Sequence, residues 1–356
     1  MIPFDIGTQR ERNQHIGAER FTTPNEVVAH LCAIQAQDFL GALWAIGVRM
    51  RNATEAAVEQ ALQQRRIVRT WPLRGTLHFV AAEDARWMLD LLAPAVMSRH
   101  AARLEREHGI TEPMLKRSRA AVRRALAGGG ALTRSASYEV LDKARIPTAG
   151  GRGLQIVWQL AHEGLICFGP RAGKQQTFVL LDDWLPASSG QISRDEALAK
   201  LARRYFTGHG PATIADFVWW SGLPVSDARK GLELARPYLE QEKDHWFAPL
   251  PDGRPSQRIH LLPPFDEFTV GYKQRGDVLD PRFARRVNNG GGMLQAVVIA
   301  AGRVVGTWKR TLRPDSVDIT IAPFRPLTRK ETREVDEACN RYAEFLGMKV
   351  ESVSCV

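Results

Sequence analysis

Cysteine is scarce and scattered in this chain of 356 residues. The four cysteines are Cys32, Cys167, Cys339 and Cys355, and none of them forms a Cys-x-x-Cys pair or a cysteine–histidine cluster. Disulfide frameworks and structural zinc sites depend on such groupings, so the sequence disfavours both. We therefore expect no metal, no other cofactor and a reducing, cytoplasmic location.

Long apolar runs are also missing. No stretch approaches the ~20 apolar residues that a membrane-spanning helix needs, and residues 1–21 mix charged with apolar side chains, unlike a secretory leader. The composition is otherwise typical of a globular protein, with 44% hydrophobic and 25% charged residues. We expect no contact with a membrane, and this length allows roughly two to four compact units.

Acidic residues are outnumbered by basic ones. Lysine and arginine total 49 against 39 aspartates and glutamates, which gives a formal charge of +10 and a pI near 9.7. A basic balance of this size favours a polyanionic partner, with nucleic acid ahead of a membrane surface or an acidic protein. A basic protein without such a partner is the alternative that charge alone leaves open.

One local pattern recurs three times: helices separated by a turn and followed by a short hairpin, the outline of a winged helix. The clearest copy lies in residues 126–188, where the hairpin turns at the basic segment 170–174. The copy in residues 1–125 enters its first helix at Thr23-Pro24 and continues into a long helix, residues 82–108, with an expected kink at Pro94. The copy in residues 189–258 has an acidic hairpin, residues 239–253, and is therefore expected to be structural.

The composition changes after Pro263. Residues 293–310 form two alternating β-runs around Ala301-Gly302, residues 316–324 form a third, and residues 328–347 have the periodicity of an amphipathic helix. We expect residues 259–356 to form a small antiparallel β-barrel closed by this helix. The fold class predicted for the whole chain is α+β.

Three segments carry a resemblance to a known family. They read "IQAQDF" from residue 34, "RGTLHFV" from residue 74 and "LLPPFDEFTVGYKQR" from residue 261. In this order, and over nearly the whole chain, the sequence resembles the AlkZ/YcaQ group of bacterial winged-helix DNA glycosylases. The resemblance implies three tandem winged helices in a C-shaped arrangement with a C-terminal β-barrel. It also implies a substrate of double-stranded DNA carrying alkyl lesions; we expect a monomer that associates with the nucleoid through DNA.

The family's catalytic signature is Gln–aliphatic–Gln, or Gln–aliphatic–Asp in a second branch. Gln35-Ala36-Gln37 matches the first form, whereas Asp38 follows one position too late to be the acid of the second. The resemblance therefore assigns Gln35 and Gln37 as the catalytic residues of a monofunctional DNA N-glycosylase. Without the resemblance, a glutamine pair at a helix junction would be read as structural or merely solvated.

Amide side chains are sufficient for this reaction when the departing base is already charged. Alkylation at N7 or N3 makes a purine cationic, so the base leaves without an enzyme acid, and the enzyme has only to position a water at the sugar. Amide oxygens can accept hydrogen bonds from that water, and positioning is the main contribution. A carboxylate base typically adds ~10²–10⁴-fold, which matters less for a cationic base. We predict excision of cationic N7- or N3-alkylated purines, with the unhooking of interstrand crosslinks as an extension.

The spacing of the two glutamines imposes a geometric condition. Residues i and i+2 diverge by ~200° on a regular helix and share one side of an extended segment. For both amides to reach one water, the motif must lie at a helix terminus or a turn. The next helix is expected to begin near Phe39.

Eight further residues are candidates for DNA contact: Arg74, His78, Arg152, Arg171, Lys174, Arg303, Lys309 and Arg310. The resemblance implies that a hairpin probes the DNA from outside, and the sequence leaves open which hairpin this is. Trp308 is the tryptophan expected near DNA. A half-buried structural histidine is the alternative for His78.

Acidic residues in or near these motifs can form ion pairs that stabilise the fold. Pairing with an acid such as Glu83 is the alternative to phosphate contact for Arg74. The adjacent residues Asp266 and Glu267 diverge on any regular element, so we expect them to pair with Lys273 or Arg275 instead of acting together as acid and base.

Two other functions compete with the glycosylase. A winged-helix transcription regulator would use Gln35 and Gln37 to read adenine edges in the major groove of undamaged operator DNA. A lesion-binding or scaffold protein would bind damaged DNA without releasing a base.

Overall fold

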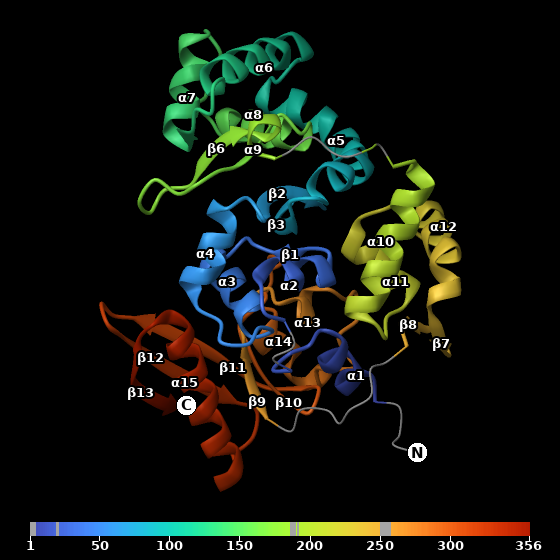
Figure 1. Cartoon of the computed structure of the whole chain (residues 1–356), viewed down its shortest axis with the longest axis vertical. Coiled ribbons are helices and arrows are strands. Elements are labelled where there is room, and N and C mark those ends of the chain that lie inside the picture. Colours follow the sequence, from blue (N-terminus) through green and yellow to red (C-terminus); the bar gives the residue numbers. More distant parts are fainter. Residues whose placement is uncertain (1–4, 19–20, 186–189, 191, 250–257) are drawn as a thin grey trace.

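The computed structural model describes residues 5–18, 21–185, 190, 192–249 and 258–356. Helices and strands alternate along the chain, and the strands of these described residues form four separate sheets. Figure 1 shows the first sheet near the middle of the molecule, with helices above it, a further group of helices to one side and the C-terminal sheet below. The α+β class predicted from the sequence is confirmed.

The central sheet belongs to the N-terminal part of the chain and has the strand order β1-β3-β2. Its elements are α1 (Ile6–Asn13), α2 (Pro24–Leu31), β1 (Ile34–Gln35), α3 (Phe39–Gly47), α4 (Glu55–Gln63), β2 (Ile67–Leu73) and β3 (Thr76–Ala81). The helix entry at Thr23-Pro24 forms as expected: Pro24 is the first helical residue, and the carboxylate of Glu26 accepts a hydrogen bond from the backbone amide of Thr23 at 2.9 Å.

The next part of the chain lies above this sheet in Figure 1. It comprises α5 (Ala85–His108), α6 (Glu112–Leu126), β4 (Leu132–Thr133), α7 (Arg134–Lys143), α8 (Arg152–His162), β5 (Ile166–Phe168), β6 (Thr177–Leu180) and α9 (Leu181–Trp184). Helix α5 is a single element through Pro94 and ends at Gly109, whose φ of 61° is left-handed. The sheet order is β4-β6-β5, and the expected basic segment, residues 170–174, lies in the β5–β6 connection.

Three helices and a hairpin follow. They are α10 (Arg194–His209), α11 (Ile214–Ser221), α12 (Val225–Ala235), the short η1 (Arg236–Tyr238), β7 (Glu240–Glu242) and β8 (His245–Phe247). The expected hairpin of residues 239–253 is present as β7 and β8, but its end at residues 250–253 lies outside the described residues. The predicted boundary at residues 188/189 also lies outside them.

The C-terminal part is built on a five-stranded sheet with the order β13-β12-β11-β10-β9. Its elements are β9 (Ile259–Leu262), α13 (Glu267–Val270), η2 (Pro281–Phe283), α14 (Ala284–Val287), β10 (Val297–Ala300), β11 (Arg303–Leu312), β12 (Ser316–Pro323), α15 (Arg329–Leu346) and β13 (Lys349–Cys355). The β10–β11 hairpin turns at Ala301-Gly302 as predicted.

This sheet differs from the expected barrel in two respects. Strand β13 pairs with β12 in parallel because α15 forms the crossover between them. Strands β9 and β13 are its two edges, so no closed barrel forms among the strands of the described residues. Trp308 was expected near DNA, and that expectation is wrong: the residue is 3% exposed, and its indole N–H donates to the carbonyl oxygen of Leu262 at 2.8 Å.

The buried apolar clusters contain residues from more than one of these parts of the chain. One apolar cluster combines α2, α3 and α4 with the C-terminal sheet and α15, where the rings of Trp44 and Tyr342 meet edge to face at 5.2 Å. A second cluster combines β2, β3 and α5 with α10 and α11, including Tyr205 and Trp220. The central sheet, with β1 at its edge, is therefore held between both clusters.

Candidate active site

The Gln-Ala-Gln motif lies where β1 ends and α3 is about to begin. Gln35 is the last residue of β1, and the amide of Ala36 continues the pairing by donating to the carbonyl oxygen of Leu77 at 2.7 Å. Asp38 caps α3 by accepting from the amide of Gly41 at 3.2 Å. The condition that the motif lie next to a helix terminus is met, and the extended backbone at its start favours a shared side for the two glutamines.

Gln37 is exposed, and its amide group has a defined orientation. Its Oε1 accepts a hydrogen bond from the backbone amide of Leu77 at 3.1 Å. This bond takes the place of a further strand pairing and turns the carbonyl oxygen toward β3. The NH₂ end of Gln37 is therefore directed away from the sheet and is the end that can donate to a bound molecule.

Gln35 is nearly buried, with 8% of its surface exposed. Its backbone amide donates to Oε1 of Glu267 at 2.9 Å. Its own Oε1 is buried and has no hydrogen-bond partner among the described residues. Since buried polar atoms are nearly always hydrogen-bonded, this oxygen is a strong candidate to bind a water or a substrate group.

His78 lies directly across the sheet from Gln35. Because Ala36 and Leu77 form the hydrogen-bonded pair next to them, Gln35 and His78 form a non-hydrogen-bonded pair, in which side chains are closest. Nδ1 of His78 lies 2.9 Å from the carbonyl oxygen of Thr76, which can only accept, so Nδ1 carries the proton. Nε2 is then a bare acceptor, and it too is buried without a partner among the described residues.

The ring of His78 stays neutral. It is fully buried, and this burial, with the charge of nearby Arg74 as a smaller cause, lowers the pKa of His78 to about 3. Thr70 pairs with His78 on the other side of β3, and its buried Oγ1 also lacks a partner in the described part of the chain. Gln35, His78 and Thr70 therefore form a row of polar side chains across the sheet, on one face of it.

A buried carboxylate lies beneath this row. Oε1 of Glu267 accepts from the amide of Gln35, and Oε2 accepts from Nε1 of Trp220 and Nε2 of His209, each at 3.0 Å. Burial alone would raise the pKa of Glu267, but the hydrogen bond and charge of His209 outweigh it and hold the pKa below its ordinary value. A negative charge is thus fixed close to the motif.

The structure corrects the expected partners of the two adjacent acids. Asp266 makes a bidentate ion pair with Arg49, at 2.9 Å and 2.8 Å, and both side chains are fully buried. Glu267 contacts the motif strand as described. The expected pairing with Lys273 or Arg275 is therefore wrong, because α13 turns both carboxylates inward.

Arg69 lies on the opposite face of the sheet from Thr70 and was not predicted. It is 7% exposed, and Nε and Nη2 both donate to the carbonyl oxygen of Ala36, at 3.1 Å and 2.7 Å. Burial lowers the pKa of Arg69 to about 10, so the side chain remains a cation at neutral pH. The available signal was the single arginine in the otherwise uncharged segment "IVRTW", because a period of two places Arg69 on the same face of the strand as Ile67 and Trp71.

Arg74 lies in the β2–β3 turn with a φ of 53°. Its guanidinium donates to the carbonyl oxygen of Trp220 and does not pair with Glu83 in the structure. Gly222, which ends α11 with a left-handed φ of 72°, allows this approach, because a Cβ there would lie 3.2 Å from the Arg74 side chain. The residue thus joins the central sheet to α11 near His78.

The other predicted DNA contacts are dispersed. Arg152 donates to the carbonyl oxygen of His108 at 2.6 Å, Arg171 pairs with Glu59 at 2.5 Å, Arg303 pairs with Asp5 at 2.6 Å, Arg310 donates to the hydroxyl of Tyr342, and Lys174 and Lys309 are exposed. Arg303 and Arg310 stand at opposite ends of β11, about 23 Å apart at 3.3 Å per residue. The β10–β11 turn and the far end of β11 are therefore separate surfaces.

The described residues contain no group of three or more histidine, cysteine, aspartate or glutamate side chains that could hold a metal ion. Within the same ranges, no helix combines the length and apolarity needed to cross a membrane.

Comparison with known proteins decides the family. The family model described as "DNA glycosylase AlkZ-like" matches residues 28–345, a span that includes the motif, His78 and Glu267. The chain belongs to the AlkZ-like family of DNA glycosylases. The resemblance stated from the three sequence segments is confirmed, and the protein is an enzyme that acts on N-glycosyl bonds of DNA.

Two comparisons with AlkZ of Streptomyces sahachiroi support this assignment. A protein of that organism named interstrand DNA cross-link repair glycosylase is 27% identical over 361 residues, which cover 95% of each chain. The solved structure of Streptomyces sahachiroi DNA glycosylase AlkZ has the same fold, with a TM-score of 0.80 and 24% identity over 98% of both chains.

Proposed function

We propose that this AlkZ-like glycosylase is monofunctional and excises cationic purines, alkylated at N7 or N3, from double-stranded DNA. The name of the Streptomyces relative extends the proposal to purines joined in interstrand crosslinks. The observation that carries it is the pair of buried, unpartnered acceptors, Oε1 of Gln35 and Nε2 of His78, on neighbouring strands.

Two adjacent acceptors hold a water in one orientation. A water that donates one proton to Gln35 and the other to His78 has its oxygen lone pairs directed outward, toward a sugar bound over the motif. That oxygen forms the new bond to C1′ while the bond from C1′ to the base nitrogen breaks. The bond's electron pair leaves with the base and neutralises its positive charge, and the excess proton of the added water is lost to solvent.

The remaining groups of the site position the DNA and stabilise the charge that develops on the sugar. The outward NH₂ of Gln37 donates to the DNA backbone beside the lesion. The anion of Glu267, one hydrogen bond from Gln35, stabilises the positive charge that develops on the sugar, and such preorganised charge is often the largest single catalytic contribution. A base that carries no charge gains little from this arrangement and stays attached.

The architecture that goes with this function is three winged helices in a C-shaped arrangement, comprising residues 1–125, 126–188 and 189–258, followed by residues 259–356. Each of the first three parts combines helices with a small antiparallel sheet, which supports this division. We propose a monomer in the cytoplasm that associates with the nucleoid through DNA, with Arg74, Arg152, Arg171, Lys174, Arg303, Lys309 and Arg310 as candidate contacts.

One assay tests the function. A duplex with a single N7-methylguanine is incubated with the purified protein, and free base and abasic sites are quantified. We expect release by the wild type and none by Gln35→Ala/Gln37→Ala; His78→Phe, which keeps a ring but removes the acceptor, should be slower. Equal release by wild type and double variant would place catalysis elsewhere.

The same assay separates the competing functions. Tight, sequence-selective binding of undamaged DNA without release would support the transcription regulator, and binding of the lesion without release would support a scaffold. The burial of Gln35 argues against the regulator, because an amide that reads base edges must project into the major groove.

A further inference from the structure

A cavity of about 210 Å³ lies on the other side of the motif from His78. It is formed between the central sheet with α4 and the β5–β6 connection, two parts that are far apart in sequence. Its lining residues are Phe39, Glu59, Leu62, Gln63, Ile67, Arg69, Phe168, Gly169, Pro170, Arg171, Gly173 and Gln176. Drug-sized ligands occupy ~300–1,000 Å³, so this smaller space suits a single planar ring system.

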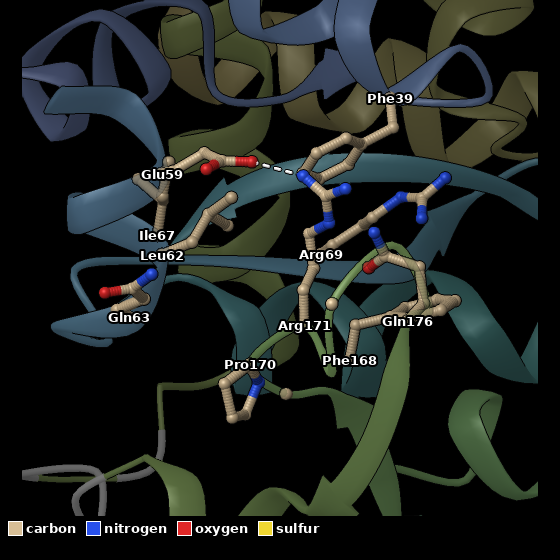
Figure 2. A pocket seen from close by; sticks show the side chains of 12 residues that line it. Phe39, Glu59, Leu62, Gln63, Ile67, Arg69, Phe168, Pro170, Arg171 and Gln176 are labelled. Atoms are coloured by element: carbon tan, nitrogen blue, oxygen red, sulfur yellow. Dashed lines mark hydrogen bonds and ion pairs between the residues drawn. The ribbon is translucent and has the colours of Figure 1, made fainter. Parts of the chain in front are cut away.

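The cavity combines aromatic faces with guanidinium groups. Figure 2 shows the guanidiniums of Arg69 and Arg171 between the rings of Phe39 and Phe168. Arg69 lies 4.8 Å from the ring centre of Phe168 and 5.4 Å from that of Phe39, and Arg171 lies 5.2 Å from that of Phe39. Planar aromatic ligands stack on both kinds of surface.

The charge of the cavity selects against a cation. Arg171 is neutralised by Glu59, whereas Arg69 has no carboxylate within ion-pair distance in the described residues. Its side chain is more than nine-tenths buried and retains its positive charge. The cationic base of the proposed reaction is therefore repelled from this space, and a neutral or anionic ring is favoured.

The cavity is close enough to the motif to receive part of the same substrate. Arg69, which lines it, is bonded to the carbonyl oxygen of Ala36 at 2.7 Å. Phe39 follows Gln37 by two residues, which span at most about 7 Å. A substituent on a base held at Gln35 and Gln37 would therefore need only a short linker to reach the rings.

We propose that this cavity binds a planar, uncharged or anionic aromatic substituent carried by the alkylated base. The inference rests on the proposed function and names a class of substrate for it: purines whose alkyl group ends in an aromatic ring. The enzyme then binds the two ends of one lesion in two places, the cationic base beside the acceptors and the ring beside Arg69.

The test compares two duplexes that differ only in the alkyl group, N7-methylguanine and N7-benzylguanine. Each carries a 2′-fluoroarabino sugar, which blocks cleavage, so that binding is measured by fluorescence anisotropy without turnover. The wild type should bind the benzyl duplex about 10-fold more tightly, a free-energy difference of about 1.4 kcal/mol. Phe168→Leu should remove this preference while leaving affinity for the methyl duplex within about 2-fold, because only the ring contact is lost.

A second pair of variants guards against effects on folding. Gln63→Trp fills the cavity and should also remove the preference, whereas Gln64→Trp, at the neighbouring exposed glutamine that does not line it, should keep it. Equal wild-type affinity for both duplexes, survival of the preference in Phe168→Leu and Gln63→Trp, or an equal loss for both duplexes would overturn the proposal. Release of N7-methylguanine from the cleavable duplex reports separately on the proposed function.

Discussion

The two faces of the central sheet next to the motif differ in charge. On one face, Gln35 and His78 present neutral acceptors, and the anion of Glu267 lies behind them. On the other, Arg69 is a buried cation stacked between aromatic rings. Because consecutive residues of a strand point to opposite faces, the neighbours Arg69 and Thr70 contribute to different sides.

This contrast suggests how a site built on amide side chains selects a base that is already positively charged. We call the side with Gln35 and His78 the acceptor face and the side with Arg69 the cationic face. The acceptor face suits the positive charge proposed to develop on the sugar, while the cationic face repels it. In the proposed reaction, a base that is already positive is therefore held on one side only, and the backbone of residue 36 separates the two environments.

The largest effect is expected at the acceptor face itself. Gln35→Ala removes the oxygen that we propose orients the water, and it should lower the single-turnover rate of N7-methylguanine release by about 10²–10³-fold, the range seen when one preorganised group is lost. Gln37→Ala removes a side chain whose oxygen already accepts a hydrogen bond from the Leu77 amide, so its rate should fall only about 10-fold. Rapid-quench measurement at saturating enzyme gives both rates. The reverse order would assign the water to Gln37.

A smaller loss is expected when the charge behind Gln35 is removed. Glu267→Gln keeps the shape and an oxygen for the Gln35 amide but loses the anion and the two hydrogen bonds that its other oxygen makes with Trp220 and His209. The rate should fall about 10–100-fold, or about 1.4–2.7 kcal/mol in barrier. Binding of an uncleavable duplex should hardly change. Asp84→Asn is the matched control: this carboxylate is also fully buried but pairs with Lys200 and Arg204 on α10. A similar loss of rate in both variants would reduce Glu267 to a structural role.

Local signals in the sequence predicted much of the fold. The capping pattern at Thr23-Pro24, the basic turn of residues 170–174 and the turn at Ala301-Gly302 all depend on neighbouring residues, and all formed where expected. The barrel was not found, because the parallel pairing of β13 through α15 depends on contacts that no short window contains.

The site was only partly predictable for the same reason. Gln35 and Gln37 came from a motif, but Glu267 reaches Gln35 across 232 positions of the chain. Nothing local distinguishes that acid from its neighbour Asp266, which pairs with Arg49. Trp308 was misplaced because alternation in a strand identifies two faces without saying which one is covered.

Acid should destabilise the acceptor face. His78 titrates near pH 6.5 when unfolded but has a pKa of about 3 in the fold, so between these values the unfolded chain binds more protons. The free energy of unfolding should therefore fall as the pH drops from about 6.5 toward 3. His162, with its pKa lowered to about 4 by burial, acts with the same sign. Urea unfolding at pH 7, 6 and 5 measures the slope, which His78→Phe should flatten; an unchanged slope in that variant would contradict a neutral His78.

The smallest effects are expected on the outer surface, where two exposed lysines are compared with a paired arginine. Lys174 and Lys309 are exposed, whereas Arg303 is held by Asp5 at 2.6 Å. If each lysine neutralises one phosphate, Lys174→Ala and Lys309→Ala should each reduce the slope of log K against log salt by about 0.9. Arg303→Ala should reduce the slope by less, since that cation is already paired with Asp5 and stands at the other end of β11. Anisotropy titrations at several salt concentrations give these slopes, and a loss of slope only in Arg303→Ala would move the DNA to the β10–β11 turn.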